Sequence, residues 1–248
     1  MIRANPRKIS MDNKRSPRDI VTSRIAEMIL TGQLKPDDQL PPVRELAKNM
    51  GISRNMCTDI IKELEEKGLL VIVPRQGVFV DDFRKNGNIH TLEAIMGAEF
   101  DLQQREIESL LELRCGMEML ACRRIIKNAS DEEINSLGKL IDKILEEKDP
   151  EKAALLTYDY YHELAVLSGN SIVPMITEGF KKSTVKLWTR YIQNYGIEQL
   201  YKSLAEVYFY IIKRDLDKVV KQILLSSSDT ISGDHSIYKD NQYDGKNT

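Results

Sequence analysis

The stretch Ser53-Arg54-Asn55-Met56, followed by Thr58, places hydrogen-bonding side chains at the start of a predicted helix. Arginine and asparagine can each form two hydrogen bonds to one base edge in the major groove of DNA, and a methyl group of Met or Thr can contact thymine. The first turn of a helix also directs unpaired backbone N–H groups outward, where they bind phosphate. This order of residues favours contact with duplex DNA. The alternative for each residue taken alone is that the polar side chains are simply solvated on a helix surface and that Met56 packs in the core.

Arg114 and a tyrosine-rich segment form a second candidate site in the other half of the chain. A buried arginine can hold a carboxylate through two parallel hydrogen bonds, and tyrosines can supply an aromatic wall and hydroxyl donors. These residue types could therefore bind the carboxylate of a small-molecule effector. The alternative is that the tyrosines pack in a core and that Arg114 pairs with Glu118. The candidate effector-binding residues are Arg114, Tyr158, Asp159, Tyr161 and His162.

Asp159 and His162 lie three residues apart, so on a helix they share a face and could act as a general acid–base pair. The chain has no nucleophile motif, phosphate-binding loop or cofactor fingerprint to accompany such a pair. A His–Asp pair in a helical bundle is usually structural. We therefore predict that the protein is not an enzyme and uses no cofactor.

Ser53 lies between two predicted helices of a small amino-terminal domain. Apolar residues recur at helical spacing in three segments, and Gly51 ends the second segment just before Ser53 begins the third. Two helices joined by so short a turn are typical of a helix-turn-helix, whose second helix enters the major groove. The three apolar stripes are Val21, Ile25, Met28 and Ile29, then Val43, Leu46, Ala47 and Met50, and then Cys57, Ile60, Ile61 and Leu64.

A short β-hairpin is predicted directly after the third helix. Its strands are Leu70–Val73 and Gly77–Val80, joined by the turn Pro74-Arg75-Gln76. A hairpin beside a helix-turn-helix is a wing. We expect the wing tip, with Arg75, Gln76 and Gly77, to lie along a phosphate strand or in the minor groove, because glycine permits close approach of the backbone.

The rest of the chain shows helical apolar stripes and no alternating strand pattern. The start Ser130-Asp131-Glu132-Glu133 is typical of a capping box, and Asp149-Pro150 of a helix cap followed by a first-turn proline. The predicted fold class is mainly α, with three helices plus a β-hairpin wing followed by an all-α helical bundle. The predicted parts are a disordered basic arm (1–17), the winged helix-turn-helix (18–84), a linker (85–95), a helical effector-binding and dimerisation domain (96–228) and a disordered tail (229–248).

The composition favours a cytoplasmic protein of two domains. Hydrophobic residues make up 42% of the 248 residues and charged residues 30%, and no stretch approaches the roughly 20 apolar residues of a membrane span. Three cysteines without paired spacing predict buried thiols rather than disulfides. The formal net charge of −2 hides an excess of Lys and Arg in residues 1–85, so this end suits a polyanion.

Several spaced motifs of the first domain resemble the winged helix-turn-helix of the GntR family of bacterial transcription regulators. They are Gly32-Gln33-Leu34-Lys35-Pro36, Arg44-Glu45-Leu46-Ala47, Gly51-Ile52-Ser53-Arg54 and Gly77-Val78-Phe79-Val80. The resemblance implies that Gly77 lies in the wing and that the residues facing DNA are Arg44, Arg54, Asn55, Met56 and Thr58. The family often has Ser-Glu at Pro42-Val43 and usually an arginine at Thr58, so we expect a different operator sequence rather than a loss of DNA binding.

The second domain has Leu110-Leu111-Glu112-Leu113-Arg114, then Ser130-Asp131-Glu132-Glu133-Ile134, then Tyr161-His162 followed by Gly169-Asn170. In this order they resemble the FCD ligand-binding domain of the fatty-acid-regulator branch of GntR proteins. The resemblance implies a helical bundle with an internal pocket for a small organic acid or a similar metabolite.

Many members of that branch hold a divalent metal through an aspartate, a histidine four residues later and two further histidines. His162 matches the first histidine of this pattern, but Tyr158 stands in place of the aspartate, and Leu204 and Ser226 stand in place of the other histidines. A transition-metal site needs three or four converging ligands. We therefore expect no metal site.

Together these features predict a ligand-responsive regulator that binds double-stranded DNA as a homodimer. A pseudo-palindromic operator suits a dimer, because two linked reading helices combine their binding energies on half-sites about one DNA turn apart. The resemblance favours repression over activation. The alternative is a constitutive DNA-binding dimer whose helical domain has no effector.

Overall fold

The computed structural model describes residues 16–96 and 104–238. The chain divides into two compact units, residues 1–103 and 104–248. The predicted basic arm lies almost wholly outside the described residues. Within the described ranges, no helix is both long enough and apolar enough to cross a membrane.

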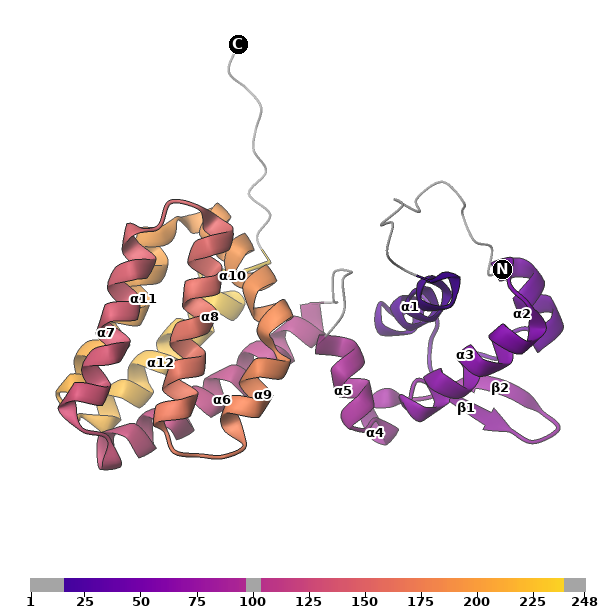
Figure 1. Cartoon of the computed structure of the whole chain (residues 1–248), viewed down its shortest axis with the longest axis horizontal. Coiled ribbons are helices and arrows are strands. Elements are labelled where there is room, and N and C mark those ends of the chain that lie inside the picture. The colour runs from indigo at the N-terminus through magenta and orange to yellow at the C-terminus, as the bar shows by residue number, and fades with distance from the viewer. Residues whose placement is uncertain (1–15, 97–103, 239–248) are drawn as a thin grey trace, which may run out of the picture. The chain divides into compact units, whose positions relative to one another are not determined.

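Unit 1 contains three helices followed by a β-hairpin and two further helices (Figure 1). Its elements are α1 (Pro17–Leu30), α2 (Val43–Met50), α3 (Arg54–Glu66), β1 (Leu70–Val73), β2 (Gly77–Val80), α4 (Phe83–Asn86) and α5 (Ile89–Met96). The strands pair antiparallel, with Leu70 opposite Val80 and Val73 opposite Gly77. The predicted helix-turn-helix and wing are thus confirmed.

The core of unit 1 forms where the apolar stripes of α1, α2 and α3 meet. Leu46, Ile60 and Leu64 have no exposed surface, and Leu69, between α3 and β1, joins them. The loop before α2 also binds the wing, because the backbone N–H of Leu40 donates to the carbonyl of Val78 at 2.9 Å. The helix-turn-helix and the wing therefore share one core and hold each other in place.

The predicted linker, residues 85–95, is helical instead and belongs to unit 1. Phe83 and Ile95 pack against the core. The Thr91 hydroxyl donates to the carbonyl of Lys67 at 2.6 Å, and the Asn88 side chain donates to the carbonyl of Glu66 at 3.1 Å. The polar residues that suggested a loop are instead hydrogen-bonded to the end of α3, which explains the error.

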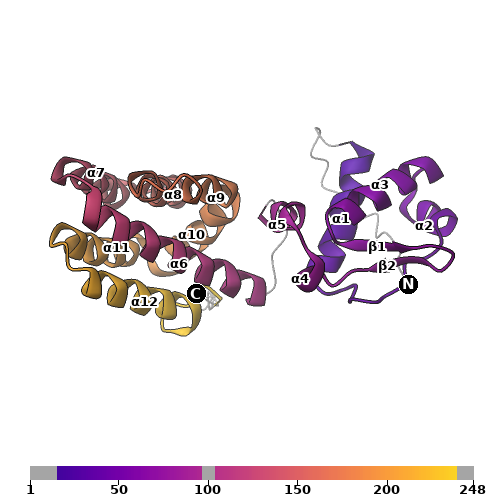
Figure 2. The same ribbon diagram turned by 90° about the horizontal axis from the view of Figure 1, so that it is seen from below.

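Unit 2 is a bundle of seven helices within the described residues 104–238 (Figures 1 and 2). They are α6 (Gln104–Asn128), α7 (Asp131–Glu146), α8 (Pro150–Leu167), α9 (Val173–Gly179), α10 (Lys181–Tyr195), α11 (Ile197–Ile212) and α12 (Leu216–Ser232). The long helix α6 packs against α8 on one side and α12 on the other. The fold class predicted for this half is confirmed.

Two helix starts in unit 2 form as the sequence predicts. Ser130 and Glu133 make a reciprocal capping box at the start of α7. The Asp149 side chain accepts hydrogen bonds from the backbone N–H groups of Glu151 and Lys152, and Pro150 occupies the first turn of α8. Cys115 and Cys122 of this unit, like Cys57 of unit 1, are buried free thiols.

The disordered tail was predicted to begin at residue 229, but the structure is ordered beyond this point. Helix α12 continues to Ser232, and residues 233–238 pack against the bundle, with Ile237 only 1% exposed. Serine and aspartate in this stretch satisfy helix-end and turn hydrogen bonds, so their polarity does not mark disorder. The remainder of the predicted tail, residues 239–248, lies outside the described part of the chain.

Candidate DNA interface and ligand pocket

The first turn of α3 is built to present polar groups outward. Ser53 caps the helix, with its hydroxyl oxygen accepting from the backbone N–H of Met56 at 3.2 Å. The stripe Cys57, Ile60, Ile61 and Leu64 faces the core, so the opposite face, with Arg54, Asn55 and Thr58, is exposed. Helix α3 therefore has the size and the surface that the major groove accepts.

Two of the side chains predicted to contact DNA, Met56 and Thr58, already have contacts within unit 1. Met56 is half-buried and packs against the core of unit 1. The Thr58 hydroxyl donates to the carbonyl of Arg54 at 3.0 Å, which leaves its oxygen and methyl group for an outside partner. Arg54 and Asn55 are thus the side chains of this turn best placed to reach base edges.

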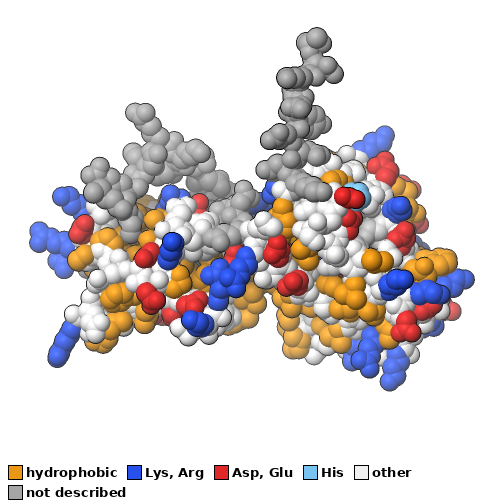
Figure 3. Space-filling model, turned by 180° about the vertical axis from the view of Figure 1, so that it is seen from behind, with side chains coloured by type: hydrophobic (Ala, Val, Ile, Leu, Met, Phe, Trp, Pro, Cys, Tyr) orange, Lys and Arg blue, Asp and Glu red, His pale blue; other side chains and the backbone are white. Residues whose placement is uncertain are grey.

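The arginines at this face carry uncompensated charge. Arg44 on α2, Arg54 on α3 and Arg75 in the wing are exposed and form no ion pair within the described residues. By contrast, Arg18 and Arg24 on α1 pair with glutamates. Figure 3 shows Lys and Arg side chains gathered over the end of unit 1 that carries α2 and the hairpin tip. Free guanidinium groups are available to neutralise phosphates.

The wing tip is shaped by one side chain from the loop before α2. The Gln39 side chain donates to the carbonyl of Gln76 at 2.8 Å, and Gln39 also bridges to Phe79. At Gly77, φ is +134°, and an added Cβ would lie 2.7 Å from the Gln39 amide nitrogen. Glycine is favoured here because residues with a Cβ rarely adopt this φ, and the close approach of the wing backbone to DNA stays a prediction.

Arg75 holds φ at +64°, a left-handed conformation that costs a residue with a side chain about 1 kcal/mol. Replacing Arg75 with glycine should therefore raise the free energy of unfolding by up to about 1 kcal/mol. The same change should weaken DNA binding. It should also make the fall of log affinity with log salt concentration shallower, by about one unit of slope for each wing. Denaturant melts and DNA titrations at several salt concentrations measure both effects. An unchanged salt slope would remove Arg75 from the interface.

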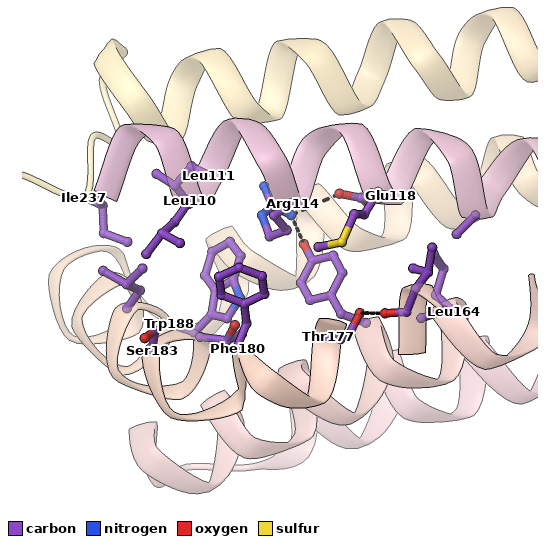
Figure 4. Close-up of a pocket in the computed structure, with 17 residues that line it drawn as sticks. Leu110, Leu111, Arg114, Glu118, Leu164, Thr177, Phe180, Ser183, Trp188 and Ile237 are labelled. Carbon is purple, nitrogen blue, oxygen red and sulfur yellow. Dashed lines mark hydrogen bonds and ion pairs between the residues drawn. The ribbon is translucent and has the colours of Figure 1, made fainter. Parts of the chain in front are cut away.

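Unit 2 contains an apolar pocket between α6, α8, α9 and α10 (Figure 4). Its cavity volume is about 60 Å³, and the cavity is partly open to solvent. Apolar and aromatic side chains make most of its wall, among them Leu110, Leu111, Leu164, Phe180, Leu187 and Trp188. The apolar groups of a ligand would match this lining in polarity.

Arg114 is the principal polar group in the pocket wall. Its Nη1 donates to Glu118 at 3.0 Å and to the Tyr161 hydroxyl oxygen at 2.8 Å. Its guanidinium carbon lies 5.0 Å from the Tyr161 ring centroid and 5.4 Å from that of Trp188, and these two rings are stacked. The alternative pairing with Glu118 is thus confirmed, and the effector role of Arg114 stays a prediction, since the same guanidinium also lines the pocket.

The Arg114 cluster still has hydrogen-bonding capacity. The Nε of Arg114 is buried and has no hydrogen-bond partner in the described structure. Burial raises the pKa of Tyr161 well above its usual range, so its hydroxyl keeps its proton and can donate it. Burial also raises the pKa of Glu118, and the neighbouring Arg114 opposes this shift. A ligand oxygen could therefore accept hydrogen bonds here without displacing the ion pair.

Tyr158, Asp159 and His162 do not line the pocket, contrary to expectation. The Tyr158 hydroxyl bonds to Glu178 of α9, and His162 Nε2 lies 4.0 Å from the same carboxylate. The hydrogen bond from Tyr158 lowers the pKa of Glu178. Asp159 is exposed. Helix geometry is the reason, because Tyr161 and Leu164 share the face toward the pocket whereas Tyr158 and His162 share a neighbouring face.

The described residues do not match the metal-binding pattern of the resembled domain. No group of three or more His, Cys, Asp or Glu side chains converges anywhere in residues 16–96 and 104–238. Leu204 is buried and carries no ligand atom, and the Ser226 and Ser203 hydroxyl oxygens lie 2.6 Å apart. These positions offer no ligand set for a transition metal.

Comparison with known families agrees with this architecture. Residues 17–80 match the family described as bacterial regulatory proteins, gntR family, and residues 81–230 match the FadR C-terminal domain. The second match covers more than half of the chain. Both are domains of transcription regulators rather than enzymes.

The relatives include two proteins named "Fatty acid metabolism regulator protein". That of Proteus mirabilis is 26% identical over 194 residues, covering 77% of this chain and 80% of its own length. That of Klebsiella pneumoniae is 27% identical over 191 residues, covering 77% of each chain. A structure titled "Lar controls the expression of the Listeria monocytogenes agr system and mediates virulence" covers 88% of this chain and 95% of its own, with a TM-score of 0.57 and 14% identity, so it supports the fold alone.

The two family matches agree with the structure, which has a winged helix-turn-helix with a polar α3 and a helical bundle with a pocket. The chain belongs to the GntR family of bacterial regulatory proteins, as a DNA-binding transcriptional regulator with a FadR C-terminal domain.

Proposed function

We propose that the protein is a homodimeric repressor that reads a pseudo-palindromic operator and is controlled by a ligand derived from a fatty acid. The observation that carries the ligand part is the pocket of unit 2, which is apolar apart from the Arg114 cluster and a few hydroxyl groups. Such a wall suits an amphiphile with an apolar chain and one oxygen-bearing end.

The DNA part of the proposal rests on the exposed face of α3. Arg54 and Asn55 would contact base edges, while Arg44 and Arg75 would contact phosphates on either side. One such domain buries little surface, so a dimer on two half-sites about one helical turn apart is needed for tight binding.

The fatty-acid character of the ligand is supported by two independent observations. Several relatives at about a quarter identity are named fatty acid metabolism regulators. The pocket of this chain has the apolar wall that an acyl chain requires, and the free Nε of Arg114 can donate to a carbonyl or carboxylate oxygen. A small, highly charged organic acid would place much of its charge against apolar side chains.

Ligand binding would reach the DNA-binding domain through α6. Leu110, Leu111 and Arg114 lie within the first three turns of this helix, which is the first described element after α5 of unit 1. A ligand that binds better to one arrangement of the two units shifts the population toward it, by no more than the difference between its two affinities. We expect the ligand-bound arrangement to be unable to span both half-sites.

Thermal unfolding of the full chain tests the ligand class. Saturated straight-chain carboxylates should raise the melting temperature, by an amount that corresponds to about 2.7 kcal/mol at a concentration a hundred times Kd. Short dicarboxylates and divalent metals should have no such effect. Stabilisation by short dicarboxylates alone would contradict the proposed class, and the absence of stabilisation by every compound would favour a constitutive DNA-binding dimer.

A further inference from the structure

Residues 233–238, here named the C-terminal strap, turn back from the end of α12 and are fixed to the bundle. The backbone N–H of Ile237 donates to the carbonyl of Thr230 at 3.0 Å, and His235 Nδ1 lies 2.6 Å from a carboxylate oxygen of Asp229. The Tyr195 hydroxyl of α10 donates to the carbonyl of Ser236 at 2.7 Å.

The strap is also held by α6, because the Tyr238 hydroxyl donates to the carbonyl of Gln104 at 3.1 Å. It is therefore bound to both α6 and α10, the two helices between which one end of the pocket lies. These contacts fix its backbone, so a side chain that it places in the pocket has a defined position.

Ile237 is the residue that the strap places in the pocket wall. It is 1% exposed, although the surrounding sequence is polar. Figure 4 shows Ile237 at one end of the pocket beside Leu110 and Leu111, and Leu164 at the opposite end. Arg114 lies between these two ends.

The two ends of the pocket differ in polarity. Glu118 and Thr177 lie on the side of Arg114 toward Leu164, so an apolar chain there would lie beside a buried carboxylate. The side toward Ile237 is walled by Leu110, Leu111 and Trp188 and carries the hydroxyl of Ser183 but no carboxylate. A ligand with its oxygen at Arg114 would therefore lay its apolar chain toward Ile237.

We propose that Ile237 is a specificity-determining residue, which closes the apolar end of the pocket and sets the longest chain that the ligand can carry. This inference rests on the proposed amphiphilic ligand. A longer chain would have to displace Ile237 and break the strap contacts, whereas a shorter one would leave a gap. Pocket walls of this kind discriminate about 10- to 200-fold for each methylene.

Trp188 gives a direct measure of binding, because it lines the pocket and is the sole tryptophan of the sequence. Saturated straight-chain carboxylates of about six to sixteen carbons, kept below their micelle concentrations, would be titrated into the full chain while Trp188 fluorescence is followed. The graded variants are Ile237→Val and Ile237→Ala. The matched control is Ile231→Ala, which makes the same truncation at the end of α12 at a residue that does not line the pocket.

In Ile237→Ala, the chain length that binds best should increase by about two or three carbons, and that longer ligand should bind about 10-fold or more tighter than to the unmodified protein. Ile237→Val should shift the optimum in the same direction by less, and Ile231→Ala should leave it unchanged. The role of Ile237 would be overturned if the best-binding chain length were the same in the unmodified protein and all three variants. It would also be overturned if both Ile237 variants lost all binding while Ile231→Ala kept it. No saturable change with any chain in any form would overturn the proposed ligand class as well.

Discussion

Replacing Arg54 with alanine is expected to weaken specific operator binding strongly while leaving the fold and the proposed dimer intact. Arg54 is exposed, has no ion-pair partner within the described residues and lies in the first turn of α3. A good arginine–base contact contributes about 1–3 kcal/mol, and the proposed dimer would lose two of them. The operator affinity should therefore fall by about 30-fold to more than 10³-fold, as measured by gel retardation at fixed salt.

Arg24→Ala is the matched control for this prediction. Arg24 is also an exposed arginine of unit 1, but it lies on α1 and pairs with Glu27 at 2.7 Å. Its removal deletes the same charge away from the reading face, so the affinity should change little beyond a general salt-dependent effect. Equal losses in both variants would show that charge alone, rather than α3, accounts for the binding.

Replacing Arg114 with methionine is expected to have the largest effect on unit 2. The change removes the partner of the buried Glu118 carboxylate and should lower the free energy of unfolding by about 3–5 kcal/mol. The double variant Arg114→Met/Glu118→Gln should recover much of this loss, because no buried charge remains. Both variants should lose the response to ligand, since the guanidinium that would hold its oxygen is gone. Urea melts and ligand-dependent release of DNA measure the two effects.

The stability loss in Arg114→Met should depend on pH in a defined direction. Burial already raises the pKa of Glu118, and without Arg114 to oppose the shift this pKa should rise further. A carboxyl with a raised pKa in the folded state contributes stability at low pH and loses it as pH increases through that pKa. The destabilisation should thus be larger at pH 8 than at pH 5. Arg123→Met, at an exposed arginine of the same helix, should show neither the loss nor the pH dependence.

The amino-terminal domain could be predicted from the sequence because each of its elements has a local signal. Gly51 at φ +68° and the Ser53 cap define the turn before α3, and Gly77 marks the wing. The α4–α5 segment was missed, since the polar residues of this stretch form hydrogen bonds to α3 that depend on tertiary structure. A polar run has the same composition whether its partners are water or backbone carbonyls.

The pocket could be predicted only in part. Arg114 and Tyr161 were found because an arginine in an apolar stripe and clustered tyrosines are unusual. Trp188, Phe180 and Ile237 were missed, because an apolar residue in a helix or a polar tail carries no sign of which cavity it will face. The tyrosine-rich segment shows the limit of spacing arguments, since a single helix directs neighbouring residues to different faces.

The central claim is that the first turn of α3 enters the major groove of an operator. Methylation protection of guanine N7, which lies in the major groove, tests this on a duplex selected from a random-sequence pool by the full-length protein. The account predicts two symmetric sets of protected guanines about one helical turn apart, with at least one guanine in each set losing protection in Arg54→Ala. A tightly bound duplex with no protected major-groove guanine, or with protection unchanged in Arg54→Ala, would contradict it.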